Sequence, residues 1–240
     1  MKKSLCFFIG LLLPTLSHAQ VPENFNQAKK VAGQIFAQNP VTLYCGCQYS
    51  KNKIDLNSCG MEAAQGIPRA HVLEWEHMMP AENFGRQLTC WRDQVCVREE
   101  KRYRGRKCCV KSSADYRRIE AELYNLWPAV GLVNQARSNY RYSVFGQTSA
   151  TAFYGCPILI DKKIRQVEPR NETKGVVARA NLFMSQKYGI KLSETQRALF
   201  IAWDKKFPPS EWERNWARQV TAIEGYSNPF IESQLAQVGN

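Results

Sequence analysis

The sequence predicts a helix-rich mixed α+β fold that forms a single domain stapled by disulfides. Apolar residues recur at helical spacing near the start of the chain and through its last third. Between these regions, short apolar segments bounded by turn-forming residues are typical of strands. The sequence shows no internal repeat and no long linker, so its length suits one large domain.

The helices are predicted from apolar periodicity and from capping residues. Residues 24–38 should form the first helix, because their apolar side chains make one stripe. A further helix is predicted over residues 115–126, bounded by Pro128, and a short helix or turn should follow it. The last third should be helical, with capping boxes that begin at Ser193 and Ser210.

Strands are predicted in two regions. A short strand should run over residues 71–77 and stop before Pro80, and residues 152–168 should be rich in strand. Residues 41–70 hold three cysteines among many turn-forming residues, which indicates an irregular segment cross-linked by disulfides.

The N-terminus has the pattern of a secretory signal peptide. Two lysines precede an apolar run, and Ser17-His18-Ala19 is typical of a cleavage site. The run is too short to cross a membrane comfortably, and no later segment is apolar enough to do so. We therefore predict a signal peptide over 1–19, a mature domain over 20–240 and a periplasmic or secreted location without a membrane segment. An uncleaved anchor is the alternative.

The charge is strongly positive. The net charge of +12 falls to +10 when the two leader lysines are removed, which favours a polyanionic partner such as nucleic acid, anionic lipid or acidic glycan. Residues 98–118 are the most basic region, and four cysteines bracket its first part. This pattern predicts a pinned basic loop rather than a free tail, with an ordinary solvated surface as the alternative.

Eight of the nine cysteines lie outside the predicted leader, and an even number in an exported chain favours disulfides. A zinc site is the alternative, but adjacent cysteines and Cys-Gly-Cys lack the usual spacing of zinc ligands. Neighbouring cysteines should have different partners, because a bridge between them is strained. The cysteines expected to form disulfides are Cys45, Cys47, Cys59, Cys90, Cys96, Cys108, Cys109 and Cys156.

Glu76 and His77 are the strongest candidates for chemistry. The mature chain carries only His71 and His77, so histidine chemistry depends on one of them. A neutral histidine can accept a proton from water, and a carboxylate can hold a divalent metal ion. Neighbours on a regular strand point to opposite faces, so both reach one site only if the chain leaves strand geometry near Met79-Pro80. In a basic, exported protein this pair suggests hydrolysis of a polyanion.

The segment around this pair resembles the active-site signature of the bacterial endonuclease I family, which comprises periplasmic and secreted nonspecific nucleases. The signature residues are Leu73-Glu74-Trp75-Glu76-His77-Met78-Met79-Pro80-Ala81 followed by Phe84-Gly85. Further segments resemble that family in the same order along nearly the whole mature chain, namely residues 105–108, 120–126, 128–134, 137–140, 167–169 and 228–230.

The resemblance implies a ββα-metal (His-Me finger) motif and a role for each site residue. It implies that His77 is the general base, that Glu76 and Asn134 are ligands of one Mg²⁺ ion, and that Arg106 binds the phosphate. Glu120 would hold metal-bound water, an assignment that helix periodicity alone does not favour over Glu122. Arg104 stays open as an alternative to Arg106. The residues expected to contact nucleic acid are Lys101, Arg102, Arg104, Lys107, Arg137 and Asn139.

These observations predict an exported, Mg²⁺-dependent endonuclease that hydrolyses phosphodiester bonds of DNA and also of RNA. It should show little sequence preference, contact mainly backbone phosphates, leave 5′-phosphate ends and act as a monomer. The alternative is a non-catalytic cationic protein that binds exported DNA or other polyanions. Charge and cysteines fit both hypotheses, whereas Glu76-His77 together with Asn134 favours the enzyme.

Overall fold

The computed structural model describes residues 20–146 and 152–238, so the predicted signal peptide lies outside the described residues. The described helices are α1 (Phe25–Phe36), α2 (Ala81–Gly85), α3 (Thr89–Arg92), α4 (Arg106–Ser112), α5 (Ala114–Glu120), α6 (Gly131–Arg137), α7 (Asn171–Tyr188), α8 (Glu194–Lys206), α9 (Glu211–Glu224) and α10 (Pro229–Val238). Short 3-10 helices include η3 (Pro68–His71) and η4 (Leu123–Asn125). The strands are β1 (Tyr49–Ser50), β2 (Lys53–Ile54), β3 (Leu73–His77), β4 (Cys96–Arg98), β5 (Lys101–Tyr103), β6 (Leu126–Val130), β7 (Arg141–Tyr142), β8 (Leu159–Asp161) and β9 (Gln166–Glu168).

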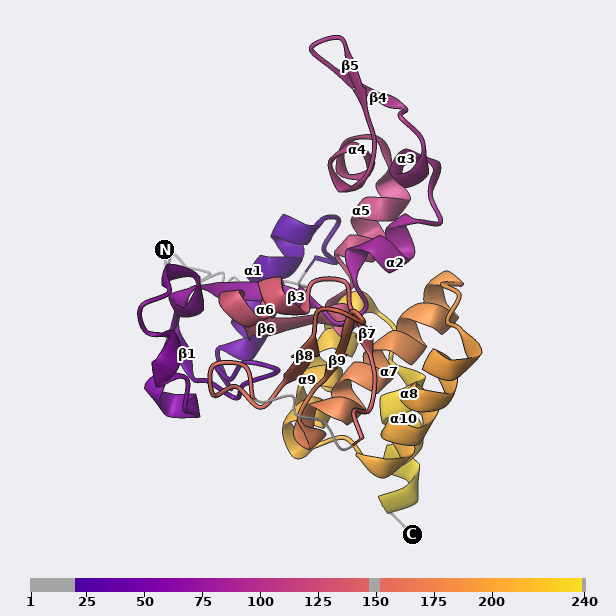
Figure 1. Cartoon of the computed structure of the whole chain (residues 1–240). Coiled ribbons are helices and arrows are strands. Elements are labelled where there is room, and N and C mark those ends of the chain that lie inside the picture. Colours follow the sequence, from indigo (N-terminus) through magenta and orange to yellow (C-terminus); the bar gives the residue numbers. More distant parts are fainter. Residues whose placement is uncertain (1–19, 147–151, 239–240) are drawn as a thin grey trace, which may run out of the picture.

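An antiparallel pair of strands lies near the middle of the molecule. β3 pairs with β6 in a register that sets Leu73 opposite Val130 and His77 opposite Leu126 (Figure 1). β6 ends at Val130, and α6 begins at the following residue, Gly131. A side chain at Gly131 would come within 2.9 Å of the carbonyl oxygen of Arg69 in η3, so only glycine allows this close packing. Glu76 and His77 lie on β3 and Asn134 lies on α6, whereas α2 to α5 and the β4–β5 hairpin come between β3 and β6 along the chain.

Several predicted elements are confirmed, and one is wrong in part. The first helix, the strand before Pro80 and the helical last third are present, and the hydroxyls of Ser193 and Ser210 cap α8 and α9. The helix expected over residues 115–126 ends at Glu120 in α5, and β6 begins at Leu126. The helix stops because the Glu122 carboxylate accepts a hydrogen bond from the Tyr124 amide, which caps η4 instead.

Helices pack against the central strands through aromatic side chains. The ring centres of Phe36 in α1 and Trp127 in β6 are 4.8 Å apart. The ring centres of Trp127 and Trp216 in α9 are 4.9 Å apart. A buried ion pair between Arg179 and Glu213 joins α7 to α9 through two hydrogen bonds of 2.6 and 2.7 Å. Trp127 of β6 and Trp216 of α9 thus belong to the interior. Within the described residues, no helix is both long and apolar enough to cross a membrane.

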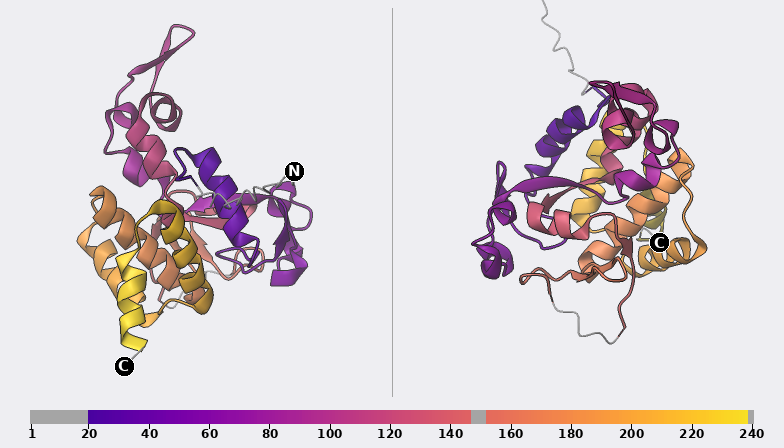
Figure 2. Two further views of the ribbon diagram at one scale, coloured as in Figure 1. Left: turned by 180° about the vertical axis from the view of Figure 1, so that it is seen from behind. Right: turned by 45° about the horizontal axis from the view of Figure 1, so that its top comes forward.

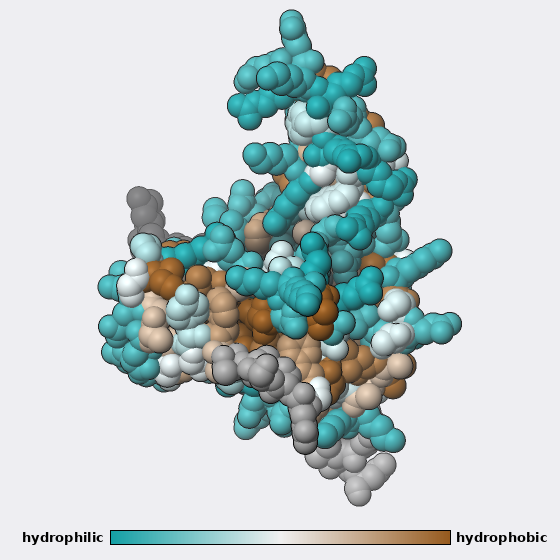
Figure 3. Space-filling view, viewed as in Figure 1, coloured by the Kyte–Doolittle hydropathy of each residue, from teal (hydrophilic) through white to brown (hydrophobic). Residues whose placement is uncertain are grey.

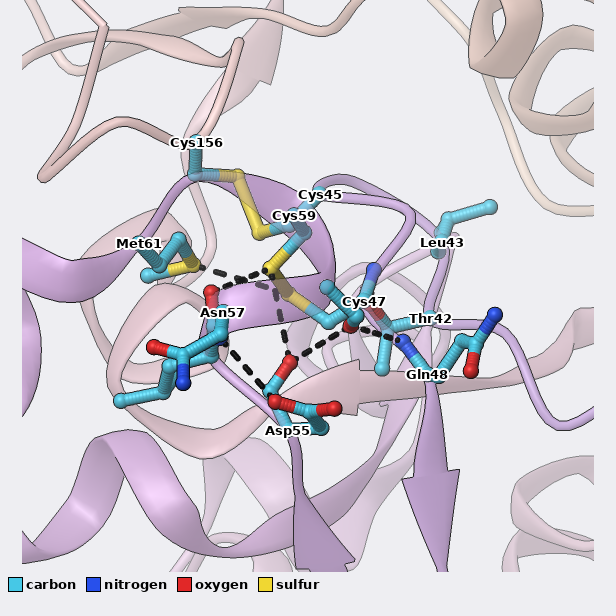
Figure 4. Close-up of a disulfide and its surroundings, with 12 residues drawn as sticks. Thr42, Leu43, Cys45, Cys47, Gln48, Asp55, Asn57, Cys59, Met61 and Cys156 are labelled. Atoms are coloured by element: carbon cyan, nitrogen blue, oxygen red, sulfur yellow. Dashed lines mark hydrogen bonds between the residues drawn. A yellow bond between two sulfur atoms is a disulfide. The ribbon is translucent and has the colours of Figure 1, made fainter.

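All eight predicted cysteines form disulfides, and adjacent cysteines have different partners, as expected. The pairs are Cys45–Cys156, Cys47–Cys59, Cys90–Cys109 and Cys96–Cys108. The first two lie together near Thr42, Asp55 and Met61 (Figure 4). Cys45–Cys156 joins the irregular N-terminal segment to the region before β8, and Cys47–Cys59 closes a loop within that segment. The helix-rich mixed α/β domain is therefore cross-linked in two separate places.

The basic region predicted as a loop is an antiparallel hairpin. β4 and β5 stand away from the body above α3 and α4, seen from the front and from behind (Figures 1 and 2). Glu99 and Glu100 form its turn with φ angles of 49° and 62°. The surface of this arm is mostly hydrophilic (Figure 3). Because Cys90 and Cys96 are bonded to neighbouring cysteines of α4, the arm is fixed at its base.

The lengths of the disulfide loops predict unequal contributions to stability. In the chain-entropy model, Cys45–Cys156, separated by 111 residues, should contribute about 5 kcal/mol, and Cys47–Cys59, separated by 12, about 3 kcal/mol. We expect the paired Cys→Ser change at Cys45 and Cys156 to lower the free energy of unfolding more than the same change at Cys47 and Cys59. Urea unfolding followed by tryptophan fluorescence measures both, and equal losses would contradict the entropic argument.

Candidate active site

Glu76 and His77 occupy opposite faces of β3, because the strand stays regular through both residues. The Glu76 carboxylate contacts Tyr44 and Arg137, whereas the His77 ring contacts Phe25 and the backbone of Glu120. The departure from strand geometry that the sequence suggested does not occur before His77. The two residues therefore meet different surroundings at the end of one strand.

The His77 ring is buried and held in one tautomer. Its Nε2 lies 2.8 Å from the carbonyl oxygen of Glu120, and because a carbonyl can only accept, Nε2 carries the proton. The lone pair of the neutral ring is then on Nδ1. Burial, together with the nearby charges of Arg106 and Arg137, lowers the pKa of His77 to about 3. The ring is thus neutral at pH 7, with Nδ1 able to accept a proton.

The Glu76 carboxylate belongs to a buried polar network. Its Oε1 accepts a hydrogen bond of 2.6 Å from the Tyr44 hydroxyl and lies 3.2 Å from Nη1 of Arg137. The Tyr142 hydroxyl lies 2.6 Å from that of Tyr44 and donates to the carbonyl oxygen of Met78. Burial raises the pKa of Glu76, and the charge of Arg137 and the hydrogen bond from Tyr44 oppose that rise.

Asn134 lies beside a second carboxylate of β3. Its Nδ2 donates a hydrogen bond of 3.0 Å to Oε2 of Glu74, whose side chain also pairs with Arg69 at 2.8 Å. Glu74 and Glu76 share one face of the strand, since side chains two residues apart point the same way. Helix α6 therefore brings an amide to the face that carries both carboxylates.

Arg106 and Glu120 lie together on the His77 side of the site. Nε of Arg106 bonds Oε1 of Glu120 at 2.6 Å, and the same oxygen accepts from the Tyr116 hydroxyl at 3.1 Å. The Glu120 carboxylate is buried, whereas the Arg106 side chain is 46% exposed and lies over the Phe25 ring. Arg104 instead donates to the carbonyl oxygen of Arg92. This geometry supports Arg106 as the arginine that faces a substrate beside His77.

A surface hollow of about 570 Å³ opens next to these residues. Phe25, Arg106 and Glu120 line it, and Phe25 also packs against His77 with ring centres 4.7 Å apart. Since His77 is itself buried and its neighbours line the hollow, this is the side from which a substrate can approach the ring.

The residues predicted to contact nucleic acid occupy two regions. Lys101, Arg102, Arg104 and Lys107 are exposed on or near the hairpin. Arg137 is only 1% exposed and binds Glu76 and the carbonyl oxygens of His77 and Met78, so a direct contact with nucleic acid does not fit its position. Burial of a guanidinium requires such partners.

Asn139 is also engaged within the protein. Its Nδ2 donates to the Glu82 carboxylate, and its Oδ1 accepts a hydrogen bond of 2.7 Å from Arg165. It lines a polar hollow of about 550 Å³ with Arg86, Arg141 and Lys191, and Arg137 also lines this hollow. Its amide therefore joins α2 to the turn before β9.

The residues on the Glu76 face fit a hard divalent cation. Within residues 20–146 and 152–238, no hydrogen bond reaches Oε2 of Glu76 or Oδ1 of Asn134, which leaves one acceptor oxygen on each. Mg²⁺ prefers oxygen ligands and keeps several waters, so one carboxylate and one amide suit it. The described part of the chain contains no cluster of three or more His, Cys, Asp or Glu side chains of the kind that holds zinc.

Glu74, Tyr44 and Arg137 contribute to this site in ways that the sequence did not suggest. The alternation of β3 could have indicated Glu74, because residues 74 and 76 must share a face. Tyr44 lies 32 residues before Glu76 in an irregular segment, and no spacing connects the two. The role of Arg137 as the partner of Glu76 likewise depends on the tertiary fold.

The lowered pKa of His77 predicts a loss of stability in mild acid. The unfolded chain binds a proton at this residue below about pH 6.5, whereas the folded protein does not until about pH 3. The free energy of unfolding should therefore fall by up to about 1.4 kcal/mol per pH unit between these values. We expect His77→Gln to flatten this dependence in urea unfolding from pH 7 to pH 4.5. An unchanged slope would show that His77 titrates alike in both states.

The chain is similar to known proteins over most of its length. The family model described as Endonuclease I matches residues 17–234. An "Extracellular deoxyribonuclease" of Aeromonas hydrophila is 39% identical over 236 residues, which cover 96% of each chain. A "Periplasmic deoxyribonuclease" of the same species is 38% identical over 94% of this chain and 92% of its own. "Endonuclease-1" of Buchnera aphidicola subsp. Baizongia pistaciae is 38% identical over 88% of this chain and 84% of its own. A match of this extent and order shows that the chain belongs to the endonuclease I family.

Proposed function

We propose that this protein is an exported, Mg²⁺-dependent nuclease that hydrolyses phosphodiester bonds within DNA and RNA. The observation that carries the proposal is the neutral His77 ring, held by the Glu120 carbonyl and flanked by the exposed guanidinium of Arg106. The names of the relatives, which include extracellular and periplasmic deoxyribonucleases, support DNA as substrate and a location outside the cytoplasm.

His77 acts as the general base in this proposal. Its Nδ1 takes a proton from the attacking water while Nε2 stays bonded to Glu120. A pKa of about 3 makes the free ring a weak base, largely because it is buried and lies near two arginines. A bound phosphate brings negative charge that offsets those arginines and favours the imidazolium. The substrate therefore raises the basicity of His77 at the moment when it is needed.

Arg106 binds the phosphate, and Glu120 positions Arg106. Only Nε of the guanidinium bonds Glu120, so its terminal nitrogens remain available for phosphate oxygens. The Glu120 oxygen that receives this bond is also fixed by Tyr116. Glu120 thus connects the base and the arginine, through its carbonyl to His77 and through its carboxylate to Arg106. This role replaces, in our proposal, the contact with metal-bound water that the family resemblance implies.

Glu76 and Asn134 would hold the Mg²⁺ ion, assisted by Glu74, which orients the Asn134 amide. When bound, Mg²⁺ supplies positive charge to the phosphate and assists departure of the leaving oxygen. Arg137 and Tyr44 oppose the rise that burial causes in the pKa of Glu76, and they orient its carboxylate in the interior.

The same surroundings favour a broad substrate range. The proposed contacts involve cations and phosphate, which carry no sequence information. We propose that the enzyme acts as a monomer with little sequence preference and leaves 5′-phosphate ends. A non-catalytic cationic protein would need the same surface charge, but not a histidine whose tautomer is fixed beside a phosphate-binding arginine.

Plasmid cleavage with and without chelator tests the proposal directly. The natural protein should nick and linearise plasmid in Mg²⁺ and be inactive in chelator. His77→Ala should slow cleavage by about 10²–10⁴, because a general base is lost. His71→Ala is the matched control and should cut at the natural rate. His71 is the last residue of η3, its Nε2 bonds the carbonyl oxygen of Gln65, and it lies outside the site. The reverse result would move the role of base to His71.

Metal dependence tests the assignment of Glu76 and Asn134. Glu76→Gln and Asn134→Ala should each raise the Mg²⁺ concentration that gives half-maximal cleavage and weaken Mg²⁺ binding measured by calorimetry. Glutamine is chosen at position 76 because removal of the whole side chain would leave the buried Arg137 without its partner. Gln135→Ala, an exposed neighbour on α6, is the control. A variant with the natural Mg²⁺ dependence would exclude that residue as a ligand.

A further inference from the structure

One face of the β4–β5 hairpin differs from the other in its surroundings. Antiparallel pairing sets Arg98 opposite Lys101 and Cys96 opposite Tyr103, so these four side chains share a face. Cys96 is bonded to Cys108 of α4, which turns this face toward the body. The residues of the other face, Val97 and Arg102, form the remaining pair and are exposed.

A hollow of about 520 Å³ follows the inward face. Its lining includes Arg98, Lys101 and Tyr103 from the hairpin and Arg106 and Lys107 from the start of α4. Val97 and Arg102 do not line it, as the alternation of the strands requires. The half-buried ring of Tyr103 is the aromatic surface in this lining, which otherwise consists of five cations and one carboxylate, that of Glu99 at the turn.

Arg106 connects this hollow with the one beside His77. It lines the hairpin hollow and also the hollow formed with Phe25 and Glu120. A chain whose phosphate is held at Arg106 can therefore continue past the cations of the hairpin toward the turn, where Glu99 adds one carboxylate. The sequence of groups along that direction is Arg106, then Tyr103, then the pair Lys101 and Arg98 near the turn.

We propose that the inward face of the hairpin binds the strand of nucleic acid that flanks the scissile phosphate, with Tyr103 stacking on a base or sugar. This inference rests on the proposed function, since it places the scissile phosphate at Arg106. Cations that track a backbone, together with an aromatic ring that accepts any base, are the usual means of binding a single strand without sequence preference. Of the exposed cations predicted from the sequence to bind nucleic acid, Lys101, Arg104 and Lys107 line the hollow and contact the strand, and Arg102 does not.

Lys101 and Arg102 provide a matched pair for the test. They are neighbours on β5, both exposed and equally charged, and they point to opposite faces. Binding is measured by fluorescence anisotropy with a fluorescein-labelled DNA single strand in chelator, so that no cleavage occurs. Lys101→Ser should weaken binding several-fold. It should also make the slope of log affinity against log salt concentration shallower by about 0.7, as expected for one lost phosphate contact on a single strand. Arg102→Ser should change both quantities much less.

Tyr103 is tested in the same assay. Loss of a stacking contact in Tyr103→Ser should weaken binding about tenfold, whereas Tyr103→Phe keeps the ring and should bind as the natural protein does. Thermal unfolding shows whether Tyr103→Ser remains folded, and if it does not, the Lys101 and Arg102 pair decides.

The outcomes separate this inference from the proposed function. Equal losses for Lys101→Ser and Arg102→Ser, or natural affinity in a folded Tyr103→Ser protein, would overturn the assigned face. Failure to cut plasmid in Mg²⁺ would overturn the nuclease proposal, and the chelator measurements would still show which face binds the strand.

Discussion

The buried guanidinium of Arg137 is the interaction on which the arrangement of the site depends. Its nitrogens bond the carbonyl oxygens of His77, Met78 and Ser138 and lie 3.2 Å from the Glu76 carboxylate. A buried cation without such partners would be strongly destabilising. The last residue of α6 is thereby fixed to the last residues of β3, which are 60 positions earlier in the chain. Asn134, one turn before Arg137 on α6, is brought to the same strand.

Regular strand geometry divides the site into two halves with different chemistry. The face with Glu74 and Glu76 is acidic and includes the Asn134 amide, which suits a hard cation. The face with His77 is apolar except for Glu120 and Arg106, and this burial keeps the imidazole neutral. The division explains how His77 and Glu76 can be adjacent in sequence without forming an ion pair, as the proposed roles of base and metal ligand require.

The sequence predicted elements whose signals are local. Periodicity and serine caps indicated α1, α8 and α9, because amphipathic stripes and capping hydroxyls act within a few residues. β6 was missed because its five residues are all buried, so they show no alternation, and Pro128 within it argues against a strand. Pro128 is tolerated because, among the described strands, β6 pairs with β3 alone. The carbonyl oxygen of Pro128 accepts a hydrogen bond from the amide of Leu43.

The hairpin and the network around Glu76 had no comparable local signal. Two-residue hairpin turns with positive φ usually contain asparagine or glycine, whereas this turn uses Glu99 and Glu100. Tyr44 reaches Glu76 only through the tertiary fold, since a loop cross-linked at Cys45 carries it there. The family resemblance indicated His77, Glu76 and Asn134, but the side chains that hold them come from distant segments whose proximity no spacing encodes.

The disulfides of the basic region solve a physical problem that its charge creates. A two-stranded ribbon is marginally stable alone, and cations crowded on it repel one another. Cys108 and Cys109 are consecutive on α4 and point about 100° apart around the helix, so they reach different partners, Cys96 in β4 and Cys90 in α3. Arg106 begins the same helix. The covalent bonds that hold the charged arm therefore also fix the helix that begins with Arg106, and the geometry of the proposed phosphate site depends on an oxidising environment.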